Sequence, residues 1–227
     1  MGTLYLVRHG QASFGQADYD RLSELGTRQC HALGAWFAGR DVRFEAVLRG
    51  TLRRHRQSLD AIADGYAAEG CGALPEALNW PGLNEYDSEA LIRCIQPEPL
   101  AAPDTPEVYR SHFRLLRRAM TAWMAGETEP VGMPSWVDFG RGVSGALDHV
   151  RSHCNGDVLL VSSGGPIATA AGQVLGCDAA TVVELNLRIR NSAVTEFAFN
   201  PKRHSLLAFN HLPHLDAVER RGWVSYS

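Results

Sequence analysis

The feature that most constrains this chain is a short apolar run at residues 4–7 that ends directly in Arg8, His9 and Gly10. Its residue types favour pleated backbone, and its length suits a buried strand. Open α/β sheets bind ligands outside the carboxyl ends of their strands, so Arg8 and His9 would lie at such a place. Gly10 lets the chain turn tightly after them, because it has no side chain. The run therefore predicts a strand that delivers a guanidinium group and an imidazole to a ligand site.

Composition suits an ordinary globular protein. The chain has 227 residues, of which 45% are hydrophobic and 21% charged, which fits one domain with a sizeable core and room for an insertion. A formal net charge of −3 argues against broad binding to nucleic acid or to anionic membranes. Any anionic ligand would therefore need a local cluster of positive side chains.

The cysteines and the apolar segments bear on the compartment. The five cysteines are odd in number, scattered and without CxxC spacing, which favours reduced thiols over a disulfide framework or a zinc site. The N-terminal apolar run is too short for a signal peptide, and no stretch approaches the roughly 18 apolar residues that span a bilayer. We therefore expect a cytoplasmic protein that binds neither nucleic acid nor a membrane.

Two further segments repeat the pattern of a strand followed by a helix. Residues 44–48 read as a strand that leads into a helix reaching about residue 68. Residues 157–161 form the best buried strand of the sequence and lead through Ser163, Gly164 and Gly165 into another helix. The first turn of a helix offers unpaired N–H groups and a positive dipole end, so both junctions suit an anion.

The other segments are expected to surround this sheet. Ser23 is expected to cap a helix that ends at Gly39. Residues from about 86 to 150 read as mostly helical, with helices beginning near residues 105 and 136, and we expect them to form an insertion over the active edge of the sheet. Further strand-like runs lie at residues 74–78, 182–187, 193–199 and 203–209.

Two groups of arginines and one pair of histidines allow more than one interpretation. Arg49, Arg53 and Arg56 favour a solvated basic helix face. A basic stripe on the helix beginning near residue 105 is either solvated or steers anionic substrates. His211 and His214 invite a metal interpretation, but no carboxylate or cysteine completes a ligand set at short spacing. The stripe consists of Arg110, Arg114, Arg117 and Arg118.

The strand ending in Arg8, His9 and Gly10 resembles the hallmark of the histidine phosphatase superfamily, the phosphoglycerate mutase-like proteins. Further segments resemble that family in chain order, so the resemblance covers nearly the whole chain. It implies an α/β fold, a three-layer sandwich with a mainly parallel central sheet and helices on both faces, in a single domain of residues 1–227. The further matches are Asp20-Arg21-Leu22-Ser23-Glu24-Leu25-Gly26, Leu52 with Arg54 and Gln57, Leu83-Asn84-Glu85, Ser163-Gly164-Gly165, and Asn210 to Leu215.

The resemblance also implies roles for particular residues. His9 would take the phosphoryl group, and Glu85 would act as the general acid and later as the base. Arg8 and Arg54 would grip the phosphate, because a guanidinium group forms bidentate bonds to its oxygens and keeps its charge. Neither a metal nor a cofactor is required. The residues expected to bind phosphate are Arg8, Arg54, Gln11, Ser163 and Gly164.

The chain departs from the family pattern at three positions within the matching segments. Gly50 and Ser58 replace a serine and a threonine in the motif around Arg54, and Ser163 stands where the family has its second catalytic histidine. Serine keeps a hydrogen-bond donor but loses the positive charge. A hydrogen bond to a charged group contributes roughly 1.5–3 kcal/mol, so we expect turnover lowered by about ten- to a hundred-fold.

These residues favour a metal-independent phosphatase that hydrolyses phosphate monoesters through a phosphohistidine. Its substrate would be a small phosphorylated metabolite or a phosphoprotein. The sequence leaves open whether the protein forms a homodimer. Two alternatives remain: a phosphotransferase of the phosphoglycerate mutase type, and a phospho-ligand-binding module with weak or no turnover.

Overall fold

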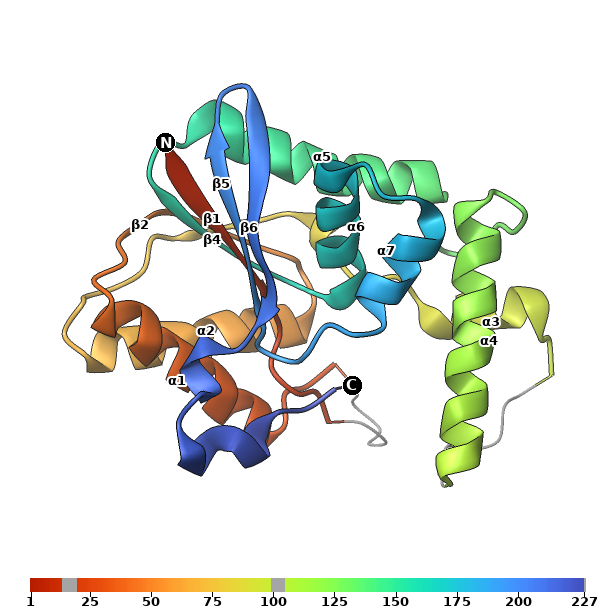
Figure 1. Ribbon diagram of the computed structural model, residues 1–227, viewed down its shortest axis with the longest axis horizontal. Coiled ribbons are helices and arrows are strands. Elements are labelled where there is room, and N and C mark those ends of the chain that lie inside the picture. The colour runs from red at the N-terminus through yellow and green to blue at the C-terminus, as the bar shows by residue number, and fades with distance from the viewer. Residues whose placement is uncertain (14–19, 99–104, 227) are drawn as a thin grey trace.

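The computed structural model describes residues 1–13, 20–98 and 105–226. Within them the chain forms a six-stranded sheet in the order β3-β2-β4-β1-β5-β6. Strands β3, β2, β4 and β1 run parallel, and β5 and β6 extend the sheet with antiparallel pairing (Figure 1). The strands are β1 (Gly2–Arg8), β2 (Phe44–Arg49), β3 (Ala77–Asn79), β4 (Asp157–Ser162), β5 (Val194–Asn200) and β6 (Arg203–His211).

Strand β1 lies inside the sheet because its side chains are apolar on both faces and join a core on each side. It pairs in parallel with β4, and the register sets Arg8 opposite Ser162. The N–H of His9 then donates to the carbonyl oxygen of Ser162 at 2.9 Å. This register brings the two residues that follow the strands, His9 and Ser163, to the same edge of the sheet.

Helices cover both faces of the sheet, which confirms the expected three-layer α/β sandwich. Helices α1 (Glu24–Gly39) and α2 (Arg53–Ala68) pack together over one face, and α5 (Trp136–His153) and α6 (Gly164–Leu175) lie on the other. Ser23 caps α1 as expected, since its Oγ accepts a hydrogen bond from the N–H of Gly26 at 3.1 Å.

The helical region between β3 and β4 has two parts. Helix α5 packs against α6, in the layer that covers the sheet. Helices α3 (Ser88–Ile95) and α4 (Pro106–Met124) lie beyond that layer in Figure 1, and α4 packs on α3 and on α7 (Ala179–Asn186). Met120 and Trp123 of α4 are buried, so this helix joins the same core. Short 3-10 helices are η1 (Pro81–Leu83), η2 (Pro213–Leu215) and η3 (Val218–Trp223).

The strand expected at residues 182–187 is wrong, because this segment lies almost entirely in helix α7. Asp178 caps the helix by accepting a hydrogen bond from the N–H of Thr181 at 2.8 Å. Val182 packs closely on α6, where a Cβ added at Gly172 would lie 2.4 Å from a Val182 methyl group. This cap and this packing override the preference of valine for strands, which is a weak effect that depends on context.

The expected edge strand at residues 74–78 is shifted toward the C-terminus. Strand β3 does lie at the edge of the sheet, but it covers Ala77–Asn79 and leaves Pro75 outside. This fits the general rule that proline cannot donate a hydrogen bond to a neighbouring strand. Among the helices that the structure describes, none is long and apolar enough to cross a membrane.

Helix α1 supports the loop after His9 through a close approach at Gly26. A Cβ added there would lie 2.2 Å from the backbone oxygen of Gln11, which cannot swing away. We expect Gly26→Ala to lower the free energy of unfolding by about 1–3 kcal/mol, the usual cost of overpacking. Urea denaturation would measure it.

The matched control is Gly39→Ala at the other end of the same helix, where no described atom lies within 4 Å of the added Cβ. That variant should gain about 0.4–1 kcal/mol, because alanine restricts the unfolded chain more than glycine does. Equal changes in the two variants would contradict the importance of the close approach at Gly26.

Candidate active site

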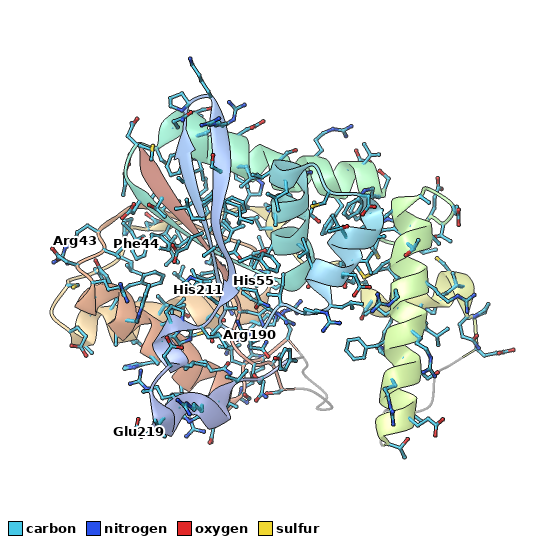
Figure 2. The ribbon with its side chains drawn as sticks, in the orientation of Figure 1. Arg43, Phe44, His55, Arg190, His211 and Glu219 are labelled. Carbon is cyan, nitrogen blue, oxygen red and sulfur yellow. The ribbon has the colours of Figure 1, made fainter. Side chains whose placement is uncertain are left out.

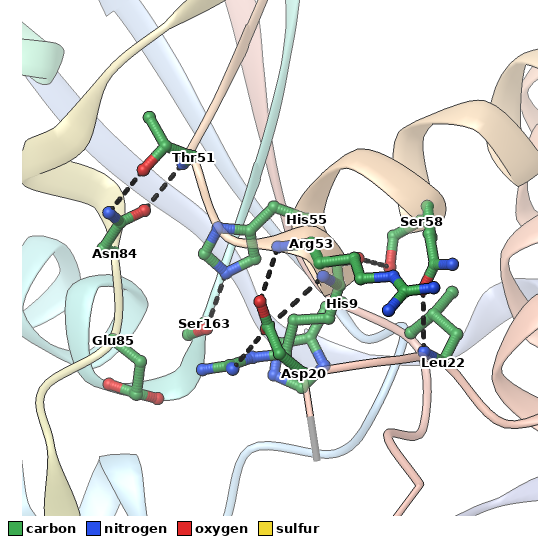
Figure 3. A network of polar contacts seen from close by, with 12 residues as sticks. His9, Asp20, Leu22, Thr51, Arg53, His55, Ser58, Asn84, Glu85 and Ser163 are labelled. Carbon is green, nitrogen blue, oxygen red and sulfur yellow. Dashed lines mark hydrogen bonds and ion pairs between the residues drawn. The ribbon is translucent and has the colours of Figure 1, made fainter. Parts of the chain in front are cut away.

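The residues expected to carry the chemistry meet at the carboxyl ends of β1, β2 and β4. His9 and Arg8 come from the end of β1, Arg54 from the first turn of α2, and Ser163 from the residue after β4. All four are buried, with exposed fractions of 2% for His9, 8% for Arg8, 7% for Arg54 and 0% for Ser163. Figure 3 shows part of this group together with Glu85, which comes from the loop after η1. The parallel strands therefore gather side chains from distant parts of the sequence.

His9 is held as a neutral imidazole with one nitrogen available. Its Nδ1 lies 2.8 Å from the carbonyl oxygen of Gly10. A carbonyl can only accept, so Nδ1 carries the proton and Nε2 keeps its lone pair. Burial lowers the pKa of His9 well below its ordinary value, and the nearby charges of Arg54 and Arg8 lower it further. This is the tautomer and the charge state that a nucleophilic histidine needs.

The two buried arginines are each tied to a neighbouring segment. Arg8 Nη1 donates to the carbonyl oxygen of Ile189, in the segment between α7 and β5. Arg54 Nη1 lies 2.8 Å from Asp20 Oδ1 in an ion pair. The other oxygen of Asp20 accepts from the backbone N–H of Arg53 at 2.7 Å, at the beginning of α2 (Figure 3). Asp20 therefore binds the helix start and the Arg54 side chain together.

Gln57 and Ser58, which follow Arg54 in the family motif, fasten α2 to the loop after β1. Ser58 Oγ donates to the carbonyl oxygen of Arg54 at 2.7 Å and accepts from the N–H of Gly10 at 3.0 Å. Gln57 Oε1 accepts from the N–H of Leu22 at 2.9 Å. These two residues therefore position the loop that follows His9, a supporting role that the motif match alone did not specify.

Glu85 lies in a loop that is fixed at neighbouring positions. Ser162 Oγ donates to the carbonyl oxygen of Leu83 at 2.7 Å. Asn84 binds Thr51 twice, accepting from its N–H at 2.7 Å and donating to its hydroxyl at 2.6 Å (Figure 3). The carboxylate of Glu85 in turn accepts from a backbone N–H on the neighbouring α6. These contacts fix the loop beside the end of β4 and the beginning of α6, and so position Glu85.

The partner of Glu85 on α6 is Gly165, whose N–H lies 3.0 Å and 3.2 Å from the two carboxylate oxygens. A Cβ added at Gly165 would lie 2.2 Å from Glu85 Oε1, so only glycine allows this approach. Burial raises the pKa of Glu85, while Arg54, the Gly165 N–H and Arg8 oppose the rise. A carboxyl group with a raised pKa suits a general acid at neutral pH. The sequence pattern pointed to Glu85, whereas the role of Gly165 follows only from the fold.

The other residues expected to bind phosphate differ in their placement. Ser163 lies at the N-terminus of α6 but makes no side-chain capping bond within the described residues. Gly164 follows it, and a Cβ added there would lie 3.7 Å from Glu85 Oε2. The Gln11 side chain instead points toward α1, because its Oε1 accepts from Ser23 Oγ at 2.8 Å. The structure therefore groups Ser163 and Gly164 with Glu85, whereas the oxygen of the Gln11 amide is engaged elsewhere.

A second histidine, which sequence analysis did not single out, lies in this group. His55 has an exposed fraction of 0% and its Nε2 lies 2.7 Å from Ser163 Oγ. The ring centroids of His9 and His55 are 5.9 Å apart. Of the three arginines interpreted from sequence as a solvated face, Arg53 and Arg56 are exposed, whereas Arg49 is half-buried. His55 faces inward instead, between the ends of the strands (Figure 2).

His211 and His214, which invited a metal interpretation, each contact a protein side chain. His211 Nε2 lies 2.8 Å from Glu196 Oε1, and His214 Nε2 lies 2.9 Å from Ser192 Oγ. Within residues 1–13, 20–98 and 105–226, no three histidine, cysteine or acidic side chains are grouped as metal ligands.

Comparison with known proteins places this arrangement in a family. The chain matches the model of the histidine phosphatase superfamily (branch 1) over residues 4–212. Among solved structures it resembles the phosphoserine phosphatase of Entamoeba histolytica in complex with 3-phosphoglyceric acid, at 20% identity and a TM-score of 0.64, over 95% of this chain and 100% of that one. No curated protein matches the chain significantly.

Two further solved structures share the fold. One is a mycobacterial glucosyl-3-phosphoglycerate phosphatase in complex with inorganic phosphate, at 21% identity and a TM-score of 0.64, over 95% of this chain and 100% of that one. The other is a phosphoglycerate mutase from Bacillus anthracis, at 16% identity and a TM-score of 0.64, over 94% of each chain. The family match begins in β1 and ends after β6, so it contains both arginines, His9, Glu85 and Ser163. The chain belongs to the histidine phosphatase superfamily.

Proposed function

We propose that this protein is a metal-independent phosphatase that hydrolyses phosphate monoesters through a phosphohistidine at His9. The observation that carries the proposal is the state of His9. Its Nδ1 is bound to the Gly10 carbonyl oxygen at 2.8 Å, and its low pKa leaves Nε2 unprotonated between the charges of Arg8 and Arg54. A neutral imidazole fixed in this tautomer is an activated nucleophile for phosphorus.

In the first step, Arg8 and Arg54 bind the oxygens of the phosphoryl group and orient it toward His9. The lone pair of His9 Nε2 forms a bond to phosphorus while the bond from phosphorus to the ester oxygen breaks. Glu85 donates its proton to the departing oxygen, so the alcohol leaves neutral. The phosphoryl charge stays between the two guanidinium groups, which supply the electrostatic stabilisation.

In the second step, a water molecule attacks the phosphohistidine. The ionised Glu85 takes a proton from that water, the bond from phosphorus to Nε2 breaks, and His9 recovers its lone pair. Inorganic phosphate leaves, and Glu85 is again protonated. The same carboxyl group therefore serves both steps, as a raised pKa and a fixed position beside Gly165 would allow.

Replacement of the nucleophile tests this function directly. We expect His9→Ala to lower kcat on an aryl phosphate by at least about a thousand-fold, since covalent catalysis then becomes impossible. The wild-type protein, quenched during turnover of a ³²P-labelled substrate, should carry acid-labile and base-stable label that is absent from His9→Ala.

The same experiment separates the rival functions. Transfer of label between phosphoglycerates in place of release as inorganic phosphate would favour a mutase-type phosphotransferase. Tight binding of phosphate esters by the wild-type protein without label or product would favour a phospho-ligand-binding module. Melting temperatures of both proteins control for misfolding.

Glu85→Gln tests the acid–base step through the leaving group. We expect kcat on an alkyl phosphate to fall by about 10²–10⁴-fold, because the alkoxide then leaves without a proton. On an aryl phosphate, whose leaving group hardly needs a proton, the loss in the first step should be much smaller. In the wild-type protein, alkyl phosphate hydrolysis should also decline on the alkaline side as Glu85 loses its proton, and this limb should vanish in Glu85→Gln. Equal losses in the first step on both substrates, measured as single-turnover formation of the phosphohistidine, would mean that Glu85 only binds the substrate or supports the site, because its role as a base in the second step is common to both substrates.

The same variant has a consequence for stability. Because burial raises the pKa of Glu85 in the folded state, its contribution to stability is present at low pH and is lost as pH rises through the folded pKa. Glutamine remains neutral throughout. Glu85→Gln should therefore melt at a higher temperature than the wild-type protein at pH 8, and this difference should shrink toward pH 4.

A basic cavity indicates which phosphate esters the site favours. Its volume is about 730 Å³, and it lies between α4, the segment after α7, and the C-terminal residues. Arg188 and Arg190 flank Ile189, whose carbonyl oxygen accepts from Arg8, so the cavity adjoins the phosphate-binding arginine. We therefore favour a small phosphorylated metabolite that carries a second anionic group. The lining residues are Arg110, Phe113, Arg114, Arg117, Leu187, Arg188, Arg190, Asn210 and Tyr226.

Two arginines of α4 provide a matched test of this cavity. Arg114 lines it, whereas Arg118, one turn further along the exposed side of the helix, does not. Phosphoserine and phosphoethanolamine differ only by a carboxylate. We expect Arg114→Ala to raise KM for phosphoserine by about ten-fold, the loss of one charged hydrogen bond, and to leave KM for phosphoethanolamine nearly unchanged. Arg118→Ala should leave both KM values unchanged. Equal effects of the two variants would mean that the arginines of α4 attract the substrate only through general electrostatics and that the cavity does not bind it.

A further inference from the structure

The pair formed by His55 and Ser163 is a fully buried polar contact of the site that the mechanism above does not use. Its two atoms, His55 Nε2 and Ser163 Oγ, lie 2.7 Å apart, and both residues have an exposed fraction of 0%. The partners come from α2 and from the N-terminus of α6, 108 residues apart in the sequence. In Figure 3 the Ser163 side chain lies between Glu85 and His9, with the His55 ring directly beside it. The contact therefore belongs to the phosphoryl site and not to a distant part of the core.

The absence of a side chain at position 50 leaves room for the His55 ring. A Cβ added at Gly50 would lie 2.1 Å from His55 Nδ1 and 2.7 Å from its Cε1, so any larger residue at position 50 would displace the ring. Ser163 meets the same ring at Nε2. Two of the positions where the chain departs from the family motif, Gly50 and Ser163, thus contact opposite ends of one imidazole.

We propose that His55 is a positioning residue for the phosphoryl site: its Nε2–H donates to Ser163 Oγ, so that the Ser163 hydroxyl donates to the phosphoryl oxygens. The pair then supplies the second polar contact that a histidine at position 163 would supply. This inference rests on the proposed phosphatase function, which it deepens by adding two residues to the site.

The hydrogen-bond inventory of the two side chains favours this direction. A neutral imidazole has one N–H and one acceptor nitrogen. Burial lowers the pKa of His55 well below its ordinary value, as do the charges of Arg54 and Arg49, so the ring is neutral. Its Nδ1 has no hydrogen-bond partner among the described residues. A proton on Nδ1 would therefore be a buried, unsatisfied donor, whereas a proton on Nε2 is used by Ser163.

The direction of this bond decides what Ser163 presents to a ligand. When Nε2–H donates to Oγ, the hydroxyl proton of Ser163 must point elsewhere, and no capping bond to α6 takes it within the described residues. When the hydroxyl donates to the ring instead, only its lone pairs remain, and they repel an anion. A phosphate ester in the site therefore selects the first arrangement, and the two successive donors polarise one another.

Two amide variants of His55 separate positioning from packing. The amide nitrogen of glutamine can take the place of Nε2 and donate to Ser163, whereas that of asparagine falls near Nδ1 and cannot reach it. We expect Ser163→Ala and His55→Asn each to lower kcat on an aryl phosphate by about ten- to a hundred-fold, and His55→Gln to retain most of it. Affinity for vanadate, which adopts the geometry of the transferring group, should fall with kcat.

A double variant gives the decisive comparison. Because His55 acts through Ser163, adding His55→Asn to Ser163→Ala should lower kcat no further. Multiplying losses would overturn the proposal, since His55 would then act independently. It would also be overturned if His55→Asn lowered only the melting temperature while kcat and vanadate affinity stayed at the wild-type level.

Another buried serine–histidine pair serves as the control for folding. Ser192 Oγ and His214 Nε2 lie 2.9 Å apart behind the backbone of His9, whose carbonyl oxygen accepts from the Ser192 N–H at 3.1 Å. His214→Asn should lower the melting temperature without the selective loss of vanadate affinity. If the wild-type protein turns nothing over, the proposed phosphatase function fails, and affinity for inorganic phosphate decides about the pair. Weaker phosphate binding by His55→Asn and Ser163→Ala, but not by His55→Gln, would support the proposed role of the His55–Ser163 pair. Unchanged binding would overturn that role.

Discussion

The parallel pairing of β1 with β4 is the constraint on which the site depends. Its register sets Arg8 opposite Ser162, and the residues that follow, His9 and Ser163, leave the sheet side by side. Strand β2, which pairs with β4 on the other side, brings α2 and Arg54 to the same edge. A slip of one residue would turn His9 and Ser163 toward opposite faces, because side chains alternate along a strand. The hydrogen bond from the His9 N–H to the carbonyl oxygen of Ser162, at 2.9 Å, continues this register past the strand ends.

Backbone groups then hold the reactive side chains in defined states. The Gly10 carbonyl fixes the tautomer of His9, and the Gly165 N–H fixes the Glu85 carboxylate. Gly165 permits this approach only because it lacks a Cβ, as does Gly50 beside His55. Backbone partners cost little entropy, since strands and helices already hold them in place. The site is therefore ordered before a ligand arrives, which is what positioning catalysis requires.

The strand that carries Arg8 and His9 could be predicted from local sequence pattern, whereas the contacts of His55 could not, because they depend on the fold. The run ending in Arg8 and His9 predicted a strand and its position because buried strands carry a strong apolar signal. The strand expected at residues 182–187 was wrong, since an Asp178 cap and packing on α6 decide that segment. His55 could not be assigned from its neighbours, because its partner is 108 residues away. The sequence indicated departures from the family motif at Gly50 and Ser163 separately, and only the fold shows that both positions contact His55.

The charges of the site suggest why a neutral pair can serve where a cation is usual. Arg8 and Arg54 carry two positive charges, while the low pKa values of His9 and His55 leave both rings neutral. A phosphate ester with nearly two negative charges is therefore met by these two guanidinium groups, of which Arg54 also pairs with Asp20. An ionised Glu85 would add a third negative charge close by, so the bound ester and burial both favour its protonated form. A cationic histidine at position 163 would oppose that effect by stabilising the Glu85 carboxylate. In the proposed mechanism, the His55–Ser163 pair would give up some attraction for the phosphoryl group and in return leave Glu85 protonated as the general acid.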